Sequence, residues 1–252
     1  MNIAAQLREK APKNVIAIVP AYNEAERVGR TVHTLKTMPH LREVIVVDDG
    51  SDDATSAVAK DAGAVVVRHP GNRGKAEAMV TGAKMASKYE AENQDPLLPG
   101  QVEPGPAALL FIDADMQETA AEAQPLLTAV LEDGVDMAIA NLPPQPGASG
   151  MGIVVRTARD GIEKETGFVA NQPLSGTRCI TRECWEACQP VASGWGVETS
   201  LTIDAVRGGF IVKEIPCELK HRATGKSFKD QLHRAAQLLG VRKALRGKRI
   251  SE

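Results

Sequence analysis

Two aspartates stand at the end of an apolar run and could together bind a divalent metal ion. Residues 107–112 are all apolar, and Asp113 and Asp115 follow them with one alanine between. A buried strand that ends here would aim both carboxylates out of the sheet, and carboxylate oxygens are ligands that Mg²⁺ and Mn²⁺ prefer. Such an ion commonly holds the phosphates of a substrate. The spacing alone is a weak signal, because Asp-x-Asp also occurs in ordinary surface loops.

Two further apolar runs end in the same way. Residues 15–19 lead into the polar turn 20–24, and residues 44–47 lead into the acidic turn 48–51. Continuous β-branched runs are expected where helices cover both faces of a parallel sheet, and ligands then bind beyond the carboxyl ends of the strands. The three runs therefore predict a nucleotide-binding edge.

A glycine-rich segment supplies positive charge for the same edge. Residues 71–75 read Gly-Asn-Arg-Gly-Lys and precede a helical pattern. Backbone N–H groups near Gly74 and the ammonium of Lys75 would meet where a diphosphate can sit at a helix N-terminus. The segment lacks the Gly-x-x-x-x-Gly-Lys-Ser/Thr spacing of a P-loop. An ordinary helix start is the alternative interpretation.

Strand-like and helical patterns alternate through the first part of the chain. This alternation is typical of parallel strands joined by crossover helices, so the fold class is α/β with a mostly parallel sheet flanked by helices. We expect strands over residues 15–19, 43–47, 64–67, 107–112 and 136–140, and helices over residues 26–37, 54–62, 75–88 and 119–132.

The second part is less regular and ends in a basic segment. We expect helices over residues 153–165, 182–188, 197–207 and 227–245, an extended piece over 172–180 and a strand over 210–217. The Pro- and Gly-rich stretches 94–106 and 142–152 read as loops. We expect one domain over residues 1–226, followed by a basic helix and tail over residues 227–252.

The composition limits the classes of function. With 252 residues, 43% of them apolar, the chain can bury a sizeable core. We find no apolar run of the roughly 20 residues that a membrane span needs, and residues 1–14 lack the apolar centre of a secretory signal, so we expect a cytoplasmic protein. The four cysteines lack Cys-x-x-Cys spacing, which favours buried free thiols over a zinc site.

The basic end has several candidate partners. Residues 213–250 contain 11 Lys and Arg against 3 Asp and Glu. Such a segment could meet phosphates, nucleic acid or an anionic membrane face, or form a solvated helix. Only 3% of the residues are aromatic, so few rings are available to stack on bases, and we expect no nucleic acid partner.

Taken in order, these motifs resemble nucleotide-sugar glycosyltransferases of the GT-A fold, similar to family 2 enzymes, over residues 15–227. The resemblance implies that the turn 20–24 lies against the base and ribose, that Asp48 bonds the base while Asp49 supports the loop, and that a Mn²⁺ or Mg²⁺ ion is the cofactor. The nucleotide-binding residues would be Pro20, Ala21, Tyr22, Glu24, Asp48, Gly50, Gly74, Lys75 and Asp113. The metal-binding residues would be Asp115 as the direct ligand, Asp113 and His221.

Residues 172–176 and 194–198 resemble the sugar and acceptor segments of glucosyl-3-phosphoglycerate synthases. Glu198 would face the transferred sugar, where a carboxylate can accept a proton or bond a hydroxyl group, so Glu198 and Asp115 are the catalytic candidates. An N-terminal helix charge is the alternative role for Glu198. The implied sugar- and acceptor-binding residues are Leu174, Ser175, Gly176, Trp195, Gly196, Glu198 and Arg222.

Two subfamilies compete in this resemblance. The synthases carry Gly-Arg where this chain has Gly152 and Ile153, and Asn where it has Ala223. Arg156 and Arg159 are the candidates to replace the contact with an acceptor phosphate. Polyprenyl-phosphate sugar transferases are the alternative, since they resemble the chain at residues 113–117 and 221–227. Their acceptor is a lipid phosphate, which would bring the basic helix to a membrane surface as a peripheral contact.

We therefore expect a metal-dependent glycosyltransferase that moves a hexose, most readily from UDP-glucose, to an unidentified acceptor. A phosphorylated molecule and a lipid phosphate are the two acceptor candidates, and the modest apolar stripe of the basic helix is compatible with a homodimer. A non-catalytic nucleotide-sugar binding protein is the alternative from a different class.

Overall fold

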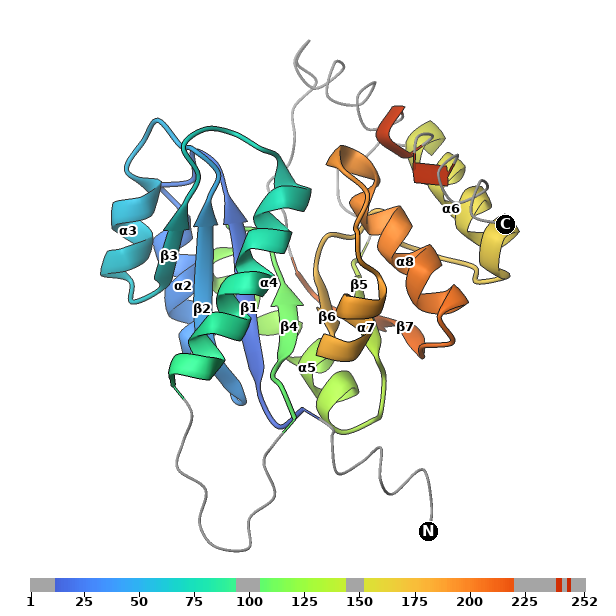
Figure 1. Ribbon diagram of the computed structural model, residues 1–252, viewed down its shortest axis with the longest axis horizontal. Helices are drawn as coiled ribbons and strands as arrows, with labels where there is room; N and C mark the ends of the chain where they lie inside the picture. The colour runs from blue at the N-terminus through green and yellow to red at the C-terminus, as the bar shows by residue number, and fades with distance from the viewer. Residues whose placement is uncertain (1–11, 94–104, 144–151, 220–238, 242–243, 246–252) are drawn as a thin grey trace, which may run out of the picture.

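A seven-stranded sheet forms the centre of the computed structural model, which describes residues 12–93, 105–143, 152–219, 239–241 and 244–245 (Figure 1). The strand order is β3-β2-β1-β4-β6-β5-β7, and only β6 runs antiparallel to its neighbours. The strands are β1 (Val15–Ala21), β2 (Leu41–Asp48), β3 (Val65–Arg68), β4 (Ala108–Phe111), β5 (Met137–Asn141), β6 (Arg178–Ile180) and β7 (Val212–Pro216).

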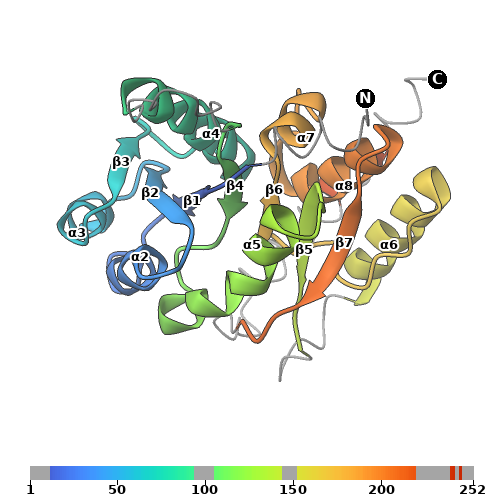
Figure 2. The same cartoon turned by 90° about the horizontal axis from the view of Figure 1, so that it is seen from below.

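Helices cover both faces of this sheet. Figure 2 shows α4, α7 and α8 on one face, and α2, α3 and α5 on the other, while α6 packs against α8. The α-helices are α2 (Val28–Lys36), α3 (Thr55–Asp61), α4 (Lys75–Glu92), α5 (Gln124–Leu131), α6 (Gly152–Thr166), α7 (Arg182–Ala187) and α8 (Val197–Arg207). Two 3-10 helices, η1 (Gln117–Ala123) and η2 (Gly194–Gly196), complete the described elements.

The alternation of side chains along β1 explains this layered arrangement. Val15, Ala17 and Val19 belong to the core under α2 and α5, whereas Ile16 and Ile18 belong to the core under α4, and all five are fully buried. A strand that is apolar on both sides can only be accommodated between two layers of helices. The predicted α/β class with a mostly parallel sheet is confirmed.

Two elements differ from the expected ones. The helix expected over residues 119–132 is divided into η1 and α5, because Pro125 lacks an N–H and is tolerated only in the first turn of an α-helix. The extended piece expected over residues 172–180 is a strand only at Arg178–Ile180. This short strand inserts antiparallel between β4 and β5, which the alternation pattern did not indicate.

A third cluster of buried side chains joins the end of the described chain to α6. Val241 and Leu245 pack with Val154, Ala158 and Ile162. Most of the helix expected over residues 227–245 lies outside the described residues, as does the boundary expected after residue 226. Among the described helices, none is long and apolar enough to cross a membrane.

The cysteines are buried free thiols, as predicted. Burial raises the pKa of Cys217 to about 11 and raises the pKa of Cys179 still further. Because a thiol reacts as its thiolate, these side chains are suited to packing rather than to chemistry.

Candidate active site at the carboxyl edge of the sheet

The order of the strands brings the predicted motifs to one edge. β1 lies between β2 and β4, with Ala21 paired to Asp48 and Ile18 paired to Phe111. The segments that follow these three parallel strands therefore leave the sheet side by side, and this edge is where open α/β sheets bind ligands.

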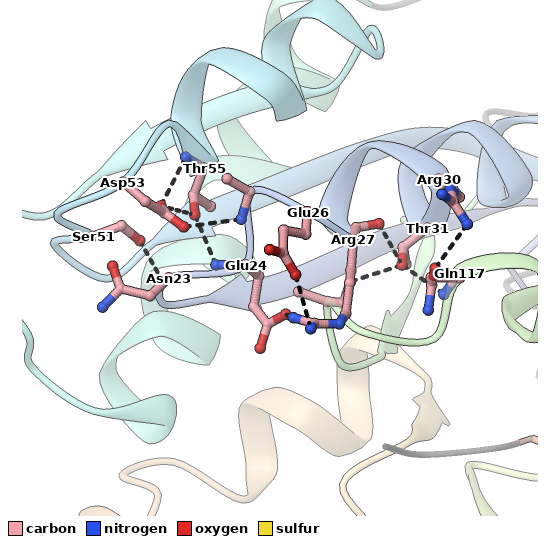
Figure 3. A network of polar contacts seen from close by, with 12 residues as sticks. Asn23, Glu24, Glu26, Arg27, Arg30, Thr31, Ser51, Asp53, Thr55 and Gln117 are labelled. Atoms are coloured by element: carbon pink, nitrogen blue, oxygen red, sulfur yellow. Dashed lines mark hydrogen bonds and ion pairs between the residues drawn. The ribbon is translucent and has the colours of Figure 1, made fainter. Parts of the chain in front are cut away.

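The turns after β1 and β2 are joined by hydrogen bonds from backbone N–H groups to short side chains (Figure 3). Asn23 N donates to Ser51 Oγ and Glu24 N donates to Thr55 Oγ1, both at 2.9 Å. Ala25 N donates to Asp53 Oδ2 at 3.1 Å. Together these bonds hold the first turn against the second.

Four predicted nucleotide contacts lie in and beside the first turn. Pro20 is half-buried and Ala21 is buried at the end of β1, whereas Tyr22 is 44% exposed and free to lie against a ligand. Glu24 is half-buried and accepts a hydrogen bond from Arg27 Nη1 at 3.1 Å. This bond and the charge of Glu24 raise the pKa of Arg27, and the Asp115 carboxylate adds a smaller effect in the same direction.

Asp48 shapes the second turn. Its side chain is fully buried, Oδ1 accepts from Ser51 N at 2.8 Å, and Oδ2 accepts from the Ser56 hydroxyl. Burial alone would raise the pKa of Asp48, but the bonds from Ser51 and Ser56 and the charge of Arg68 lower it overall. Both carboxylate oxygens are buried and already accept bonds from the chain, so the predicted contact between Asp48 and a nucleobase stays a prediction.

Asp49 fastens the glycine-rich segment to this turn. Its carboxylate accepts from Arg73 N at 2.9 Å and from Gly74 N at 2.7 Å, and His69 Nδ1 lies 2.7 Å from it. His69 is buried, and its Nε2 lies 2.9 Å from Thr81 Oγ1 on α4. The sequence indicated that Asp49 supports a loop, whereas a histidine outside any motif gave no signal for His69.

Gly50 is required by geometry at this point. Its φ is +79°, a conformation that side chains rarely adopt, and a Cβ here would lie 2.5 Å from the Gly71 carbonyl carbon. We call the segments 20–25, 48–55 and 69–74 the edge turns.

Lys75 connects three of the predicted motifs. Its Nζ lies 2.7 Å from Asp113 Oδ1 and 3.6 Å from Glu198 Oε1. A Cβ on Gly176 would lie 2.2 Å from the same nitrogen, so only a glycine allows this approach. Burial alone would lower the pKa of Lys75, but the two carboxylates raise it above its ordinary value, so the ammonium is charged at neutral pH.

A fully buried arginine joins the segments that carry Ser175 and Glu198. Arg178 Nη2 donates to Ser175 O at 2.6 Å, and Nη1 donates to Glu198 O at 3.3 Å. Its Nε finds no hydrogen-bond partner within the described part of the chain. Burial lowers the pKa of Arg178, and the nearby Glu198 carboxylate, which is itself buried, opposes that effect. We call Lys75, Asp113, Arg178 and Glu198 the charge cluster.

Half-buried and buried side chains alternate along residues 113–116. Ala114 and Met116 are buried, whereas Asp113 and Asp115 are half-buried. In contrast to Asp113, Asp115 forms no hydrogen bond or ion pair with any described residue. Its carboxylate is therefore available for a ligand.

The structure shows no contact between the remaining predicted sugar and acceptor residues and the charge cluster within the described part of the chain. Leu174 packs against the cluster formed by α6 and α8. Gly196 lies against the end of the described chain, because a Cβ there would meet Gly240 O and Ala244 Cβ, both at 2.7 Å. The backbone of Trp195 lies in η2. His221 and Arg222 lie outside the described residues.

Comparisons with known proteins agree with this edge architecture. Residues 16–151 match the sequence family described as glycosyl transferase family 2. The chain is 29% identical over 222 residues to the uncharacterized protein MJ1222 of Methanocaldococcus jannaschii, covering 84% of each. It is 30% identical over 212 residues to the glucosyl-3-phosphoglycerate synthase of Mycolicibacterium smegmatis, covering 77% of this chain but only 65% of that synthase.

A solved structure shows the same fold. The glucosyl-3-phosphoglycerate synthase of Mycobacterium tuberculosis, crystallised with Mg²⁺ and UDP, superposes with a TM-score of 0.72 at 24% identity. The match covers 98% of this chain and 83% of that one. The predicted GT-A fold is thereby confirmed, and the chain belongs to glycosyl transferase family 2.

Proposed function

We propose that the protein is a cytoplasmic, metal-dependent hexosyltransferase that takes its sugar from UDP-glucose. The observation that carries this proposal is the position of the Lys75 ammonium, 2.7 Å from Asp113 and 3.6 Å from Glu198 at the carboxyl edge of the sheet. This arrangement brings a phosphate-binding cation, a metal-binding segment and a buried carboxylate to one place.

The residues present suit a divalent ion that is shared with a diphosphate. Asp113 and Asp115 offer hard oxygen ligands, and the described residues contain no group of three or more His, Cys, Asp and Glu side chains that could hold a metal ion by themselves. A site of few protein ligands is what Mg²⁺ or Mn²⁺ uses when phosphate and water complete its shell. When bound, the ion neutralises charge on the departing nucleoside diphosphate. His221 is proposed as a further ligand from outside the described residues.

Lys75 binds the diphosphate together with the start of α4. This helix has 18 residues and begins at Lys75, so its N-terminal backbone groups carry partial positive charge. The charged ammonium adds a full positive charge. Asp49 accepts hydrogen bonds from Arg73 N and Gly74 N and so holds the start of α4 in place. The helix N-terminus is therefore positioned before the ligand arrives.

Glu198 is proposed to contact the sugar or the acceptor. It stands in the first turn of α8 with its backbone carbonyl held by Arg178. A carboxylate at this position can accept a hydrogen bond or a proton from a sugar or acceptor hydroxyl group. Ser175, Gly176, Leu174, Trp195, Gly196 and Arg222 are proposed to line the same region.

The relatives support the donor more directly than the acceptor. The M. tuberculosis synthase has been crystallised with Mn²⁺, UDP-glucose and phosphoglyceric acid. In this chain, the position expected for an acceptor-binding arginine is Ile153, which is exposed. Arg159 donates to Ala170 O and Asn171 O, whereas Arg156 is exposed on the same helix. We therefore propose a phosphorylated acceptor that is held through Arg156.

A turnover experiment tests the proposal. The purified protein is incubated with UDP-glucose, UDP-galactose, UDP-N-acetylglucosamine, GDP-mannose or GDP-glucose, with Mn²⁺ or Mg²⁺, with and without 3-phosphoglycerate, and the products are followed by NMR. We expect metal-dependent release of UDP from UDP-glucose, and loss of that release in Asp115→Asn. Asp133→Asn, which changes an exposed aspartate after α5, is the matched control and should behave like the unaltered protein.

Two outcomes of this experiment would count against a hexosyltransferase. If no donor is cleaved and neither UDP nor GDP binds in a metal-dependent way, the glycosyltransferase proposal is wrong. Metal-dependent binding of UDP without cleavage of any donor, across all acceptors tried, would instead favour a nucleotide-sugar binding protein.

A further inference from the structure

A threonine on α2 bonds the chain on both sides of Asp115. Thr31 is fully buried, and its hydroxyl donates to Ala114 O at 2.7 Å and accepts from Gln117 N at 2.8 Å. Figure 3 shows Thr31 on α2 and Gln117 at the start of η1 facing each other. One side chain therefore fixes the carbonyl before Asp115 and the amide two residues after it.

This use of the hydroxyl is unusual for a helical threonine. A threonine inside a helix commonly donates to the carbonyl four residues earlier, which is Arg27 O here. That oxygen is 3.4 Å from Thr31 Oγ1, compared with 2.7 Å for Ala114 O. Since a hydroxyl has a single hydrogen, the shorter bond takes it, and the donor capacity of Thr31 serves the Asp115 segment.

The Asp115 segment needs such support because its backbone conformation is uncommon. Gln117 has a φ of +51°, which is rare for a residue with a side chain. Ala114 and Met116 are buried on either side of Asp115, so an unpaired carbonyl or amide here could not turn to water. The two hydrogen bonds with Thr31 satisfy the Ala114 carbonyl and the Gln117 N–H, and so stabilise the backbone conformation on both sides of Asp115.

Given the proposed function, we infer that Thr31 is the positioning residue of the Asp115 metal ligand and acts through the backbone of residues 114–117. Arg30 contacts the same segment, with Nη1 3.2 Å from Gln117 Oε1 and 3.7 Å from Glu118 Oε1. Arg30 and Glu118 are exposed, however, and solvent screens their contact, so Arg30 contributes little to the position of Asp115.

The test measures Mn²⁺ binding directly, by calorimetric titration in the presence of UDP. Thr31→Val keeps the shape of the side chain and removes the hydroxyl. Thr31→Ser and Thr31→Ala form a second pair, which differ from each other only in the hydroxyl. The controls are Arg30→Ala and Thr34→Val, which makes the same change three residues further along α2 at a side chain that takes no part in these contacts. UDP binding without metal and thermal unfolding are measured for every variant.

We expect Thr31→Val and Thr31→Ala to weaken Mn²⁺ binding by roughly 10- to 100-fold, the usual effect of losing a group that orients a metal ligand. The Mn²⁺ affinity of Thr31→Ser and of both controls should stay within about threefold of that of the unaltered protein, which is a smaller change than the loss expected for Val and Ala. The affinity for UDP without metal should be unchanged in every variant. A general loss of structure would instead weaken UDP binding as well. If Thr31→Val does not fold, the Ser and Ala pair gives the same comparison.

Equal Mn²⁺ affinity in Thr31→Ser and Thr31→Ala would overturn the inference and leave the proposed function intact. The inference is also wrong if metal-free UDP binding falls as much as Mn²⁺ binding. Absence of Mn²⁺ binding by the unaltered protein would instead contradict the proposed function itself, and the inference with it.

Discussion

The edge turns and the charge cluster are built on different principles, although they lie at one edge of the sheet. The edge turns are held by backbone N–H groups that donate to short side chains, such as Gly74 N to Asp49 and Glu24 N to Thr55. The charge cluster is held by long charged side chains from separate elements, with Lys75 and Arg178 as its cations. The edge turns are thus fixed mainly by backbone hydrogen bonds, and the charge cluster by buried electrostatics.

The two regions also differ in the sign of their pH sensitivity. The pKa of Asp48 in the edge turns is lowered, so its stabilisation is present above the ordinary aspartate pKa and disappears as pH falls through the folded value. The pKa of Lys75 is raised, so its stabilisation is present below the ordinary lysine pKa and disappears as pH rises through the folded value. Acid should therefore loosen the edge turns, and alkali should loosen the charge cluster.

The largest effect is expected from Lys75→Met. Removing a preorganised cation from a reaction that develops negative charge typically lowers kcat by about 100- to 1000-fold. Steady-state kinetics with UDP-glucose and Mn²⁺ measure this loss. Lys88→Met, at an exposed position on the same helix, should keep full activity, and an equal loss in the two variants would show that charge on α4 in general is responsible.

A large effect on stability is expected from Arg178→Met. The change leaves the buried Ser175 O without a donor and removes one of the bonds to Glu198 O, which still accepts from Thr202 Oγ1, at a cost of about 2 kcal/mol in the free energy of unfolding. Urea denaturation followed by circular dichroism measures the difference. A variant as stable as the unaltered protein would mean that burying the guanidinium costs as much as its two hydrogen bonds contribute.

A smaller effect, with a distinct pH dependence, is expected from Asp48→Asn. The variant loses bonds to an ionised acceptor, so the free energy of unfolding at pH 7 should fall by about 1.5 kcal/mol. This difference should shrink as pH falls from the ordinary aspartate pKa of about 3.9 through the lower pKa of the folded protein, because the unfolded chain takes up a proton before the native carboxyl does. Urea denaturation at several pH values tests both points, and a difference that is independent of pH would show that Asp48 acts only by its shape.

The smallest effect is expected from Arg73→Ala. Among the described residues, the Arg73 side chain forms only an exposed contact with Glu77, 3.4 Å away, which is worth less than about 0.5 kcal/mol. Its backbone N–H, which bonds Asp49, is kept in the variant. Thermal unfolding should therefore barely change, and a clear loss of stability would show that the edge turns depend on side-chain charge after all.

The contrast between the two regions also explains what the sequence could predict. The edge turns follow apolar strands directly, so a strand pattern and a turn motif were enough to locate Asp48, Asp49, Gly50 and Gly74. The helix over Val197–Arg207 was also predicted with its observed bounds. Local spacing carries this information, because the residues that make the contacts lie within or beside the motifs.

Other residues gave no such signal. An arginine in a strand is usually exposed, so the complete burial of Arg178 follows only from the insertion of β6 between β4 and β5. Thr31 reads as an ordinary helical residue, because its bonds join positions more than 80 residues apart in the chain. The place of Trp195, His221 and Arg222 in the site stays a prediction, as does a homodimer.

The most direct measurement is a crystal structure of the protein with UDP and Mn²⁺. We predict an ion that contacts Asp115 and both phosphates of UDP, with the Lys75 ammonium bonded to a phosphate oxygen and Tyr22 and Glu24 beside the nucleoside. A nucleotide bound away from the carboxyl edge of β1, β2 and β4, or an ion that does not touch the Asp113–Asp115 segment, would contradict the proposed function.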